Sequence, residues 1–346
     1  MKKIFFVLFL SFYCSCSAFA GVGTTTGLVL LEPLDARSVG LGGACASLDG
    51  YAAYLYYNPA SLGTLTNAQF LCYFHNSSVI GINQGSITFA YPLKSIGTFG
   101  IDVVYLNAGK MEVNFPDGTS SEVISEQDFT GTISFGKTIF TNWNVGLNAK
   151  AVSSRLIESK SAFGFGFDAG VLYKGLLDKR LNAGLSLQNI GTGLKYIEQK
   201  DPFPVLMDGG LSYDLRVWSV GILVAADGVY RMKEELFRLK AGIEGNYGPL
   251  FLRGGCPLSS ADDEKFTVGI GGKMDEEMLS DLMGTGKSAG SRKEKKEGKE
   301  DKNKQFLNKY FLDYGITFSK NLGLSHRVSI GMELGRSQDK SGGKKK

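Results

Sequence analysis

Apolar residues alternate with small or polar residues along most of this 346-residue chain. Between Ala162 and Tyr173, one face carries bulky residues such as Phe163 and Phe165, whereas the other face carries three glycines and Asp168. Similar alternation recurs at 181–187, 237–244 and 328–334. Because successive side chains of a β-strand point to opposite faces, each stretch predicts a strand with one continuous apolar face.

Fourteen strands are predicted in all. They lie at 69–76, 84–92, 99–107, 128–138, 144–154, 162–173, 181–188, 205–214, 217–226, 236–246, 249–255, 265–272, 310–319 and 326–335. We expect an all-β fold, a transmembrane antiparallel β-barrel whose even strand number returns the chain to its starting side. A barrel of this size is too wide for its own side chains to fill, so its lumen holds a channel, a ligand cavity or a plug. A soluble periplasmic β-sandwich or propeller is the alternative, because a sandwich would bury the same apolar faces.

The chain begins with the pattern of a secretory leader. A basic start at Lys2 and Lys3 precedes a short apolar stretch and an A-x-A site that ends at Ala20. We therefore expect a signal peptide at 1–20, cleaved after Ala20, and export to the bacterial outer membrane. Lipidation at Cys14 or Cys16 is the alternative, and the bulky residues in front of them disfavour it.

Three further regions depart from the strand pattern. Residues 21–66 are rich in small residues and turns and lose the alternation between Pro33 and Ala60, which predicts a plug, or hatch, inside the lumen. The barrel then spans 67–336 and is interrupted by a charged insertion at 274–308, which we expect to be flexible and solvated. Counting back from a periplasmic C-terminal strand puts this insertion on the periplasmic side. A basic tail follows at 337–346.

Charge and rare residues exclude several classes of function. The 38 basic and 34 acidic residues give a net charge of +4, which does not indicate nucleic-acid binding. Behind the leader, three widely spaced cysteines and two histidines form neither a disulfide framework nor a metal-ligand motif, so we expect no metal and no cofactor. Residues 286–288 match only the end of a phosphate-binding loop, and no Ser, His and Asp set has a recognisable setting. We predict that the protein is not an enzyme.

The predicted plug carries the most specific motifs. It reads L-D-A-R-S-V-G-L-G-G-A at 34–44 and Y-N-P-A-S-L at 57–62, with Asp49 between them. This order resembles the opening of the PorV/PorQ family of FadL-like outer-membrane proteins, which reads G-A-R-A-L-G-M-G-G-A, then D-D, then W-N-P-A-G-L. The chain departs from it at Asp35, Gly50, Tyr57 and Ser61. Weaker landmarks follow in order at 185–191, 202–204, 210–213, 239–242, 312–314 and 322–330.

The resemblance implies a barrel with an N-terminal hatch and two alternative roles. FadL-like proteins take up long-chain fatty acids or other hydrophobic compounds by diffusion through the hatch and the wall. PorV-like proteins are accessory barrels that bind partner proteins in export. The implied partners are hydrophobic small molecules, outer-membrane lipid and the barrel-assembly machinery, and no motif decides between the two roles.

Four residues of the predicted plug are candidates for the hatch. Asn58, Pro59 and Ala60 match the N-P-A turn of the FadL hatch, and a rigid turn is physically reasonable because proline fixes φ and restricts the residue before it. An ordinary turn that positions the plug is the alternative. Arg37 invites an anion-binding role, but an ion pair between plug and wall is the stronger interpretation.

Basic residues on the predicted inner face are candidates for ligand binding. Strand alternation directs four of them to the lumen, namely Lys150, Arg238, Lys240 and Arg253, together with Asp102, Asp168 and Asp313. Such cations could bind the carboxylate head of an amphiphile through charge-assisted hydrogen bonds. A network within the wall is the alternative for each of them.

Overall fold

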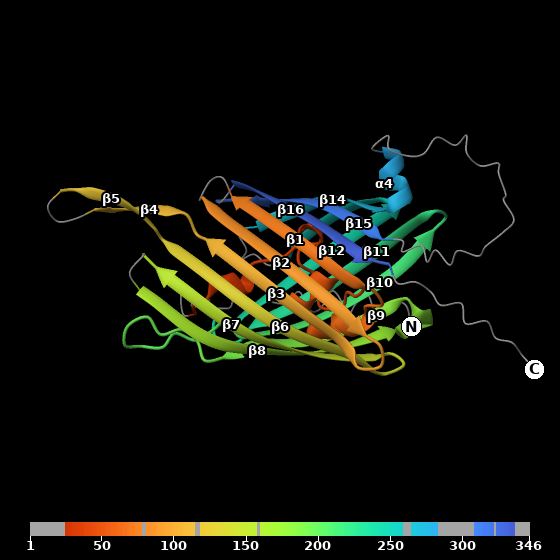
Figure 1. Cartoon of the computed structure of the whole chain (residues 1–346), viewed down its shortest axis with the longest axis horizontal. Coiled ribbons are helices and arrows are strands. Elements are labelled where there is room, and N and C mark those ends of the chain that lie inside the picture. The colour runs from red at the N-terminus through yellow and green to blue at the C-terminus, as the bar shows by residue number, and fades with distance from the viewer. Residues whose placement is uncertain are drawn as a thin grey trace, which may run out of the picture.

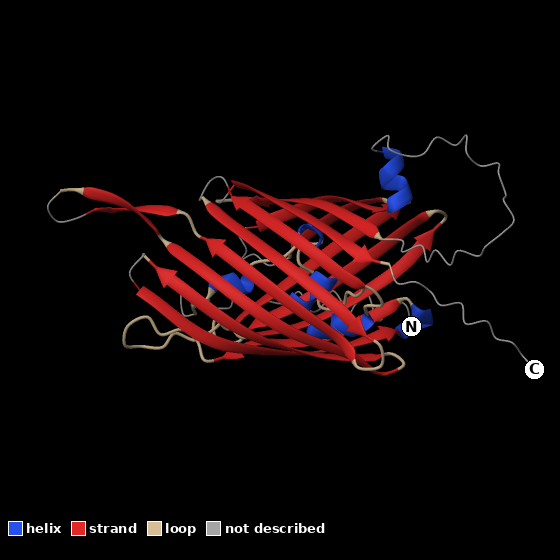
Figure 2. Ribbon diagram, in the orientation of Figure 1, coloured by secondary structure: helices blue, strands red, loops and turns tan. Residues whose placement is uncertain are grey.

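The computed structural model describes residues 25–77, 81–114, 118–157, 160–258, 264–282, 308–321 and 323–335. Fourteen antiparallel strands close into one barrel (Figures 1 and 2). The barrel strands are β1 (Ala68–Ser77), β2 (Ile82–Leu93), β3 (Gly97–Asn107), β6 (Glu126–Phe140), β7 (Trp143–Leu156), β8 (Lys160–Gly175), β9 (Leu181–Gly191), β10 (Leu206–Val217), β11 (Val220–Arg231), β12 (Leu236–Tyr247), β13 (Leu250–Pro257), β14 (Glu264–Asp275), β15 (Lys309–Ser319) and β16 (Gly323–Leu334).

The closed ring confirms the predicted barrel and rules out a sandwich. Each strand pairs with its neighbour in the chain order, and β1 pairs with β16 from Ala68 opposite Leu334 to Ser77 opposite Ser325. All fourteen predicted strands are present. The sequence pattern missed one hairpin, β4 (Lys110–Asn114) with β5 (Ser120–Ile124), which projects from the barrel at the left of Figure 1.

The outer face of the barrel is apolar and the inner face is polar. Phe163, Phe167 and Ile330 each expose more than half of their side-chain surface to the outside. Asp102 and Thr88, on inward positions of β3 and β2, are buried, and the Thr88 hydroxyl donates to the Asp102 carboxylate over 2.6 Å. A soluble protein would not expose an apolar surface of this extent, so the outer face is that of a membrane-spanning barrel. Within the described residues, no helix is long and apolar enough to cross a membrane.

The two ends of the barrel differ in their connections. At one end, which we call the turn end, short connections at 93–97, 140–143, 175–181, 217–220 and 247–250 join successive strands, and β16 ends there. At the other end, the loop end, the connections include the β4–β5 hairpin and residues 192–205. Figure 1 shows the loop end at the left and the turn end at the right.

Residues 25–66, which we call the luminal segment, run through the inside of the barrel from the loop end to the turn end (Figure 2). They form short helices, namely η1 (Leu28–Leu31), α2 (Ala36–Gly40), η2 (Ala52–Tyr56) and η3 (Pro59–Thr64). Asp35 caps α2, because its carboxylate accepts from the Ser38 N–H over 2.7 Å. Asn58 caps η3, with Pro59 at the first helical position, where a missing N–H costs nothing.

The charged insertion begins with more regular structure than the sequence pattern predicted. Met274 and Asp275 continue β14, and α4 (Glu276–Leu282) follows at the turn end. The Asp275 carboxylate accepts from the Met278 N–H over 2.9 Å and caps this helix, a signal that the charge pattern obscured. The predicted signal peptide, the remainder of the insertion at 283–307 and the tail at 337–346 lie outside the described residues. A short helix, α3 (Leu176–Lys179), lies in the β8–β9 connection.

Candidate functional site

Inward-facing glycines hold the luminal segment against the wall. A Cβ atom at Gly184 of β9 would overlap the carbonyl of Ala46, and one at Gly146 of β7 would overlap Pro59. Gly242 of β12 leaves the same space for Leu41. The wall therefore fits the backbone of the segment closely over a wide arc, and only glycine permits this approach.

Asn58 connects the luminal segment to itself and to the barrel. Its side-chain amide donates to the Ala46 carbonyl over 2.8 Å and to the Val171 carbonyl of β8 over 3.0 Å. Its side-chain oxygen accepts from the Ala60 N–H over 3.1 Å. Asn58 is fully buried, so its amide makes no hydrogen bonds to water, and these bonds to the protein take their place. The N-P-A turn of the sequence motif is thus the point at which two parts of the segment and the wall meet.

Arg37 binds the wall by an ion pair. Its Nε and Nη2 donate to the two carboxylate oxygens of Glu244 on β12, over 3.0 and 2.9 Å. The same carboxylate accepts from Arg253 Nε over 2.6 Å, and Arg253 Nη1 donates to Asp313 over 2.6 Å. The guanidinium of Arg37 also lies over the ring of Tyr54, 5.6 Å from its centroid. These four charges join α2 to three strands, β12, β13 and β15.

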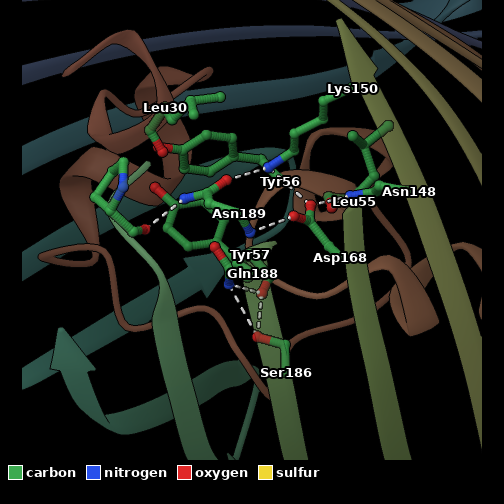
Figure 3. Close-up of polar contacts among 11 residues, drawn as sticks. Leu30, Leu55, Tyr56, Tyr57, Asn148, Lys150, Asp168, Ser186, Gln188 and Asn189 are labelled. Carbon is green, nitrogen blue, oxygen red and sulfur yellow. Dashed lines mark hydrogen bonds and ion pairs between the residues drawn. The ribbon is translucent and has the colours of Figure 1, made fainter. Parts of the chain in front are cut away.

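A second buried network surrounds Lys150 (Figure 3). Its ammonium group lies 2.8 Å from an Asp168 carboxylate oxygen and donates to the Asn189 side-chain oxygen over 2.7 Å. Asn148 donates to Asp168 over 2.7 Å and to the Leu55 carbonyl over 2.9 Å, so this network also contacts the luminal segment. Lys150 is therefore held within the wall, as the alternative interpretation of the sequence had it.

A bulge in β9 makes this network possible. Phe167 pairs with Ile190 and Ala169 with Leu187, so two residues of β9 stand opposite Asp168 alone. The second of them, Asn189, has φ of 61° and donates its N–H to Asp168 over 2.8 Å. The extra residue turns the Asn189 side chain inward, where it meets Lys150.

A cavity of about 370 Å³ lies between the luminal segment and the wall towards the loop end. Four of its lining residues are basic and two are acidic, namely Arg231, Arg238, Lys240 and Arg327 against Glu32 and Asp208. Apolar surface faces them from Leu28, Leu31, Val39, Leu206 and Val229, and the rings of Tyr56 and Tyr57 complete the lining. The cavity thus combines an excess of positive charge with an apolar wall.

Two residues that line this cavity carry a buried polar atom with no hydrogen-bond partner among the described residues. Arg327 is only 4 % exposed, and its Nη1 donates to Thr317 over 2.5 Å. Within the part of the chain that the structure describes, its Nε and the hydroxyl of Thr267 have no hydrogen-bond partner, although both residues line the cavity. Because an unpaired buried donor is costly, these atoms favour an occupant that accepts hydrogen bonds.

A second cavity of about 490 Å³ opens towards the turn end. It is lined by Arg37, Tyr54, Asp214, Arg216 and Phe251, among others. The two cavities lie on either side of α2 and the residues that follow it, since Arg37 lines one cavity whereas Val39, Gly42 and Gly43 line the other. Tyr54 likewise lines this cavity whereas Tyr56 and Tyr57 line the other, so the luminal segment lies between the two.

Burial controls the protonation of groups in the luminal segment. Burial raises the pKa of Tyr56 well above its ordinary value, with a further contribution from Glu32, so the phenol that borders the loop-end cavity stays neutral. Burial also raises the pKa of Asp35, and hydrogen bonds from Ser38 oppose this effect. Among the described residues, no group of three or more His, Cys, Asp or Glu side chains is placed to hold a metal ion.

The candidate basic residues fall into two pairs. Arg238 and Lys240 line the loop-end cavity, whereas Lys150 and Arg253 form ion pairs inside the wall. Sequence reasoning missed Arg231 and Arg327 in that cavity. Arg327 alternates with the outward Val328 and Ile330, so strand alternation already placed it on the inner face. Arg231 was missed because the predicted strand at 217–226 ended five residues before it, whereas β11 extends to Arg231.

No family model matches the sequence, and no curated protein matches it. Solved structures do match the fold. The toluene transporter TbuX of Ralstonia pickettii is similar with a TM-score of 0.55 and 12% identity over 89% of this chain and 99% of that one. The toluene transporter TodX of Pseudomonas putida gives a TM-score of 0.53 and 12% identity over 88% of this chain and 98% of that one.

These likenesses establish the fold class of the protein. The chain forms a closed 14-stranded barrel of the fold that TbuX and TodX have, and the FadL-like resemblance of the sequence stays a prediction beyond the fold. Both of these structurally similar proteins are transporters by name. Membership of the PorV/PorQ family stays a prediction.

Proposed function

We propose that the protein is an outer-membrane transporter for hydrophobic compounds, and that its substrates are amphiphiles with an anionic head, such as long-chain fatty acids. Two proteins of the same fold are named as toluene transporters, which supports a hydrophobic substrate class. The charge of the loop-end cavity supports a substrate with an anionic head. Four basic residues against two acidic ones would be of no use to a plain hydrocarbon such as toluene.

The loop-end cavity carries this proposal. A carboxylate in this cavity could accept charge-assisted hydrogen bonds from Lys240, Arg238 and Arg327. The Nε–H of Arg327 is buried and has no acceptor among the described residues. Leu28 and Leu31 of η1 offer apolar surface for the chain of the same ligand. A volume of about 370 Å³ lies within the range of small-molecule sites.

The proposed route leads from the loop-end cavity to the turn-end cavity. The luminal segment lies between the two, with α2 and the residues after it at 36–43 bordering both, and its displacement would join them. The Arg37 ion pair with Glu244 holds the stretch in place. In this proposal the luminal segment is the hatch, and the turn at Asn58 stays bound to the barrel wall when the hatch moves. We further propose that the turn end faces the periplasm, as the even strand number suggests.

Equilibrium binding by the detergent-solubilised protein tests the substrate class. The probes are a radiolabelled long-chain fatty acid and radiolabelled toluene, and the variant is Lys240→Met, which keeps most of the side-chain volume but removes the charge. Loss of one charged hydrogen bond is worth about 1.5–3 kcal/mol, so we expect fatty-acid affinity to fall roughly tenfold or more. Toluene binding should not change, because toluene carries no charge.

Lys110→Met is the matched control, because Lys110 pairs with Glu122 on the exposed β4–β5 hairpin, away from the cavity. It should bind both probes as the wild type does. Equal fatty-acid affinity of wild type and Lys240→Met would contradict the anionic substrate. If neither probe binds the wild type at all, transport itself is in doubt, and the PorV-like accessory role becomes the better hypothesis.

A further inference from the structure

Two carboxylates lie close together on the inner face of β6, at the loop end of the barrel. Glu126 and Asp128 are two residues apart, so their side chains point to the same face of the strand. Asp128 is only 1% exposed, whereas Glu126, at the start of β6, is partly exposed. Their negative charges repel each other, and one of the two is shielded from bulk water.

The Asp128 carboxylate has no partner in the part of the chain that the structure describes. Neither of its oxygen atoms has a hydrogen-bond partner there, and no ion pair between described residues includes Asp128 or Glu126. The buried Asp168, by contrast, lies 2.8 Å from the ammonium group of Lys150. Because a buried carboxylate without a partner is costly, this site favours an occupant with positive charge.

Hydroxyl groups accompany the two carboxylates. Ser154 of β7 stands directly opposite Asp128, and its hydroxyl donates to Glu126 over 3.4 Å. Thr130 is the next inward residue after Asp128 on β6 and is also buried. Its hydroxyl has no hydrogen-bond partner among the described residues, which is a second sign that an occupant belongs here. The polar atoms of these four side chains are all oxygen.

Surroundings made of oxygen atoms favour calcium over other common cations. Ca²⁺ is bound by carboxylates, other oxygen atoms and water in a flexible geometry, whereas Mg²⁺ demands a nearly ideal octahedron. Zinc sites usually include cysteine or histidine, and neither is among these residues. With only two acidic side chains, the site needs water to complete the coordination, and the partly exposed Glu126 leaves room for it.

The same groups connect to the start of the luminal segment. Tyr196, in the connection at 192–205, donates its hydroxyl to Ser154 over 2.8 Å. The Tyr196 hydroxyl also lies 3.4 Å from the hydroxyl of Thr26. The helix η1, which follows Thr26, contacts β6. An ion held by Glu126 and Asp128 would therefore lie where the wall, this connection and the luminal segment meet.

We propose that Glu126 and Asp128, with the hydroxyl groups of Ser154 and Thr130 beside them, form a calcium-binding site at the loop end. The ion neutralises the buried Asp128 carboxylate. Through Ser154 and Tyr196 it also stabilises the start of the luminal segment. This inference does not depend on the proposed transport function.

Terbium luminescence tests the proposal on the full chain in detergent, with folding checked by the gel mobility before and after heating. Tb³⁺ binds oxygen ligands as Ca²⁺ does, and a nearby phenol such as that of Tyr196 sensitises its emission. Asp128→Asn removes the charge with almost no change in shape. Glu126→Gln is a second variant, at the more exposed edge of the site.

Asp102→Asn is the matched control. Asp102 is also a buried, inward-facing carboxylate, and it lies on β3 four residues from Leu106, the residue that pairs with Asp128. The control therefore removes a comparable charge outside the proposed site.

We expect the wild type to give saturable Tb³⁺ emission that Ca²⁺ displaces. Asp128→Asn should lower the affinity for Tb³⁺ roughly tenfold or more, because the charge of the ligands sets calcium affinity. Glu126→Gln should lower the affinity as well, and Asp102→Asn should bind as the wild type does.

Two results would overturn the proposal. One is a folded wild type without emission that Ca²⁺ displaces, which would favour a proton shared between the two carboxylates. The other is Tb³⁺ binding by Asp128→Asn and Glu126→Gln with the affinity of the wild type, which would place the bound ion elsewhere.

Discussion

Arg253 shows how single residues hold the lumen together. Its guanidinium is almost fully buried and donates to Glu244 and to Asp313, each over 2.6 Å. Glu244 in turn binds Arg37 of the luminal segment. One residue therefore balances two buried carboxylates and indirectly fixes α2.

Arg253→Met should be strongly destabilising, because it leaves two buried carboxylates with less compensation. Breaking a buried ion pair in this way costs about 3–5 kcal/mol. Urea unfolding of the reconstituted protein, followed by the change in gel mobility between folded and heat-denatured barrel, measures this loss. Lys110→Met removes an exposed pair with Glu122 and should cost less than about 1 kcal/mol. Equal midpoints for the two variants would show that the Arg253 network contributes little.

Strand alternation was sufficient to predict the barrel elements. Each barrel strand has one face towards lipid and one towards the lumen, so an apolar stripe marks it in the sequence. The β4–β5 hairpin was not predicted because it faces neither lipid nor the lumen. It therefore has no continuous apolar face, and it carries charged residues such as Lys110, Glu112 and Glu122. The helices of the luminal segment were also not predictable as such, since each spans only one or two turns and depends on the wall for its seat.

The fit between strands and luminal segment yields a prediction at this scale. Gly184→Ala places a Cβ against the Ala46 carbonyl and should displace the segment from the wall, whereas Gly131→Ala meets nothing within 4 Å. Ion conductance of single barrels in planar lipid bilayers reports on this displacement. We expect Gly184→Ala to conduct more than the wild type and Gly131→Ala to match it. A closed Gly184→Ala barrel would mean that the segment adapts without opening the lumen.

For the molecule as a whole, the sequence predicted which residues face the lumen but not what they do there. Strand alternation alone placed Lys150 and Arg238 on the inner face. Their partners depend on the register between strands and on the path of the luminal segment, neither of which a periodic pattern contains. The β9 bulge that brings Asn189 to Lys150 is one example, and the path of η1 past Arg327 is another.

Uptake of a labelled long-chain fatty acid into vesicles that contain the folded protein tests the central claim most directly. A transporter for anionic amphiphiles predicts saturable uptake, with an initial rate that falls in Lys240→Met and is unchanged in Lys110→Met. Uptake no faster than in protein-free vesicles, by a protein shown to be folded and membrane-inserted, would contradict the claim.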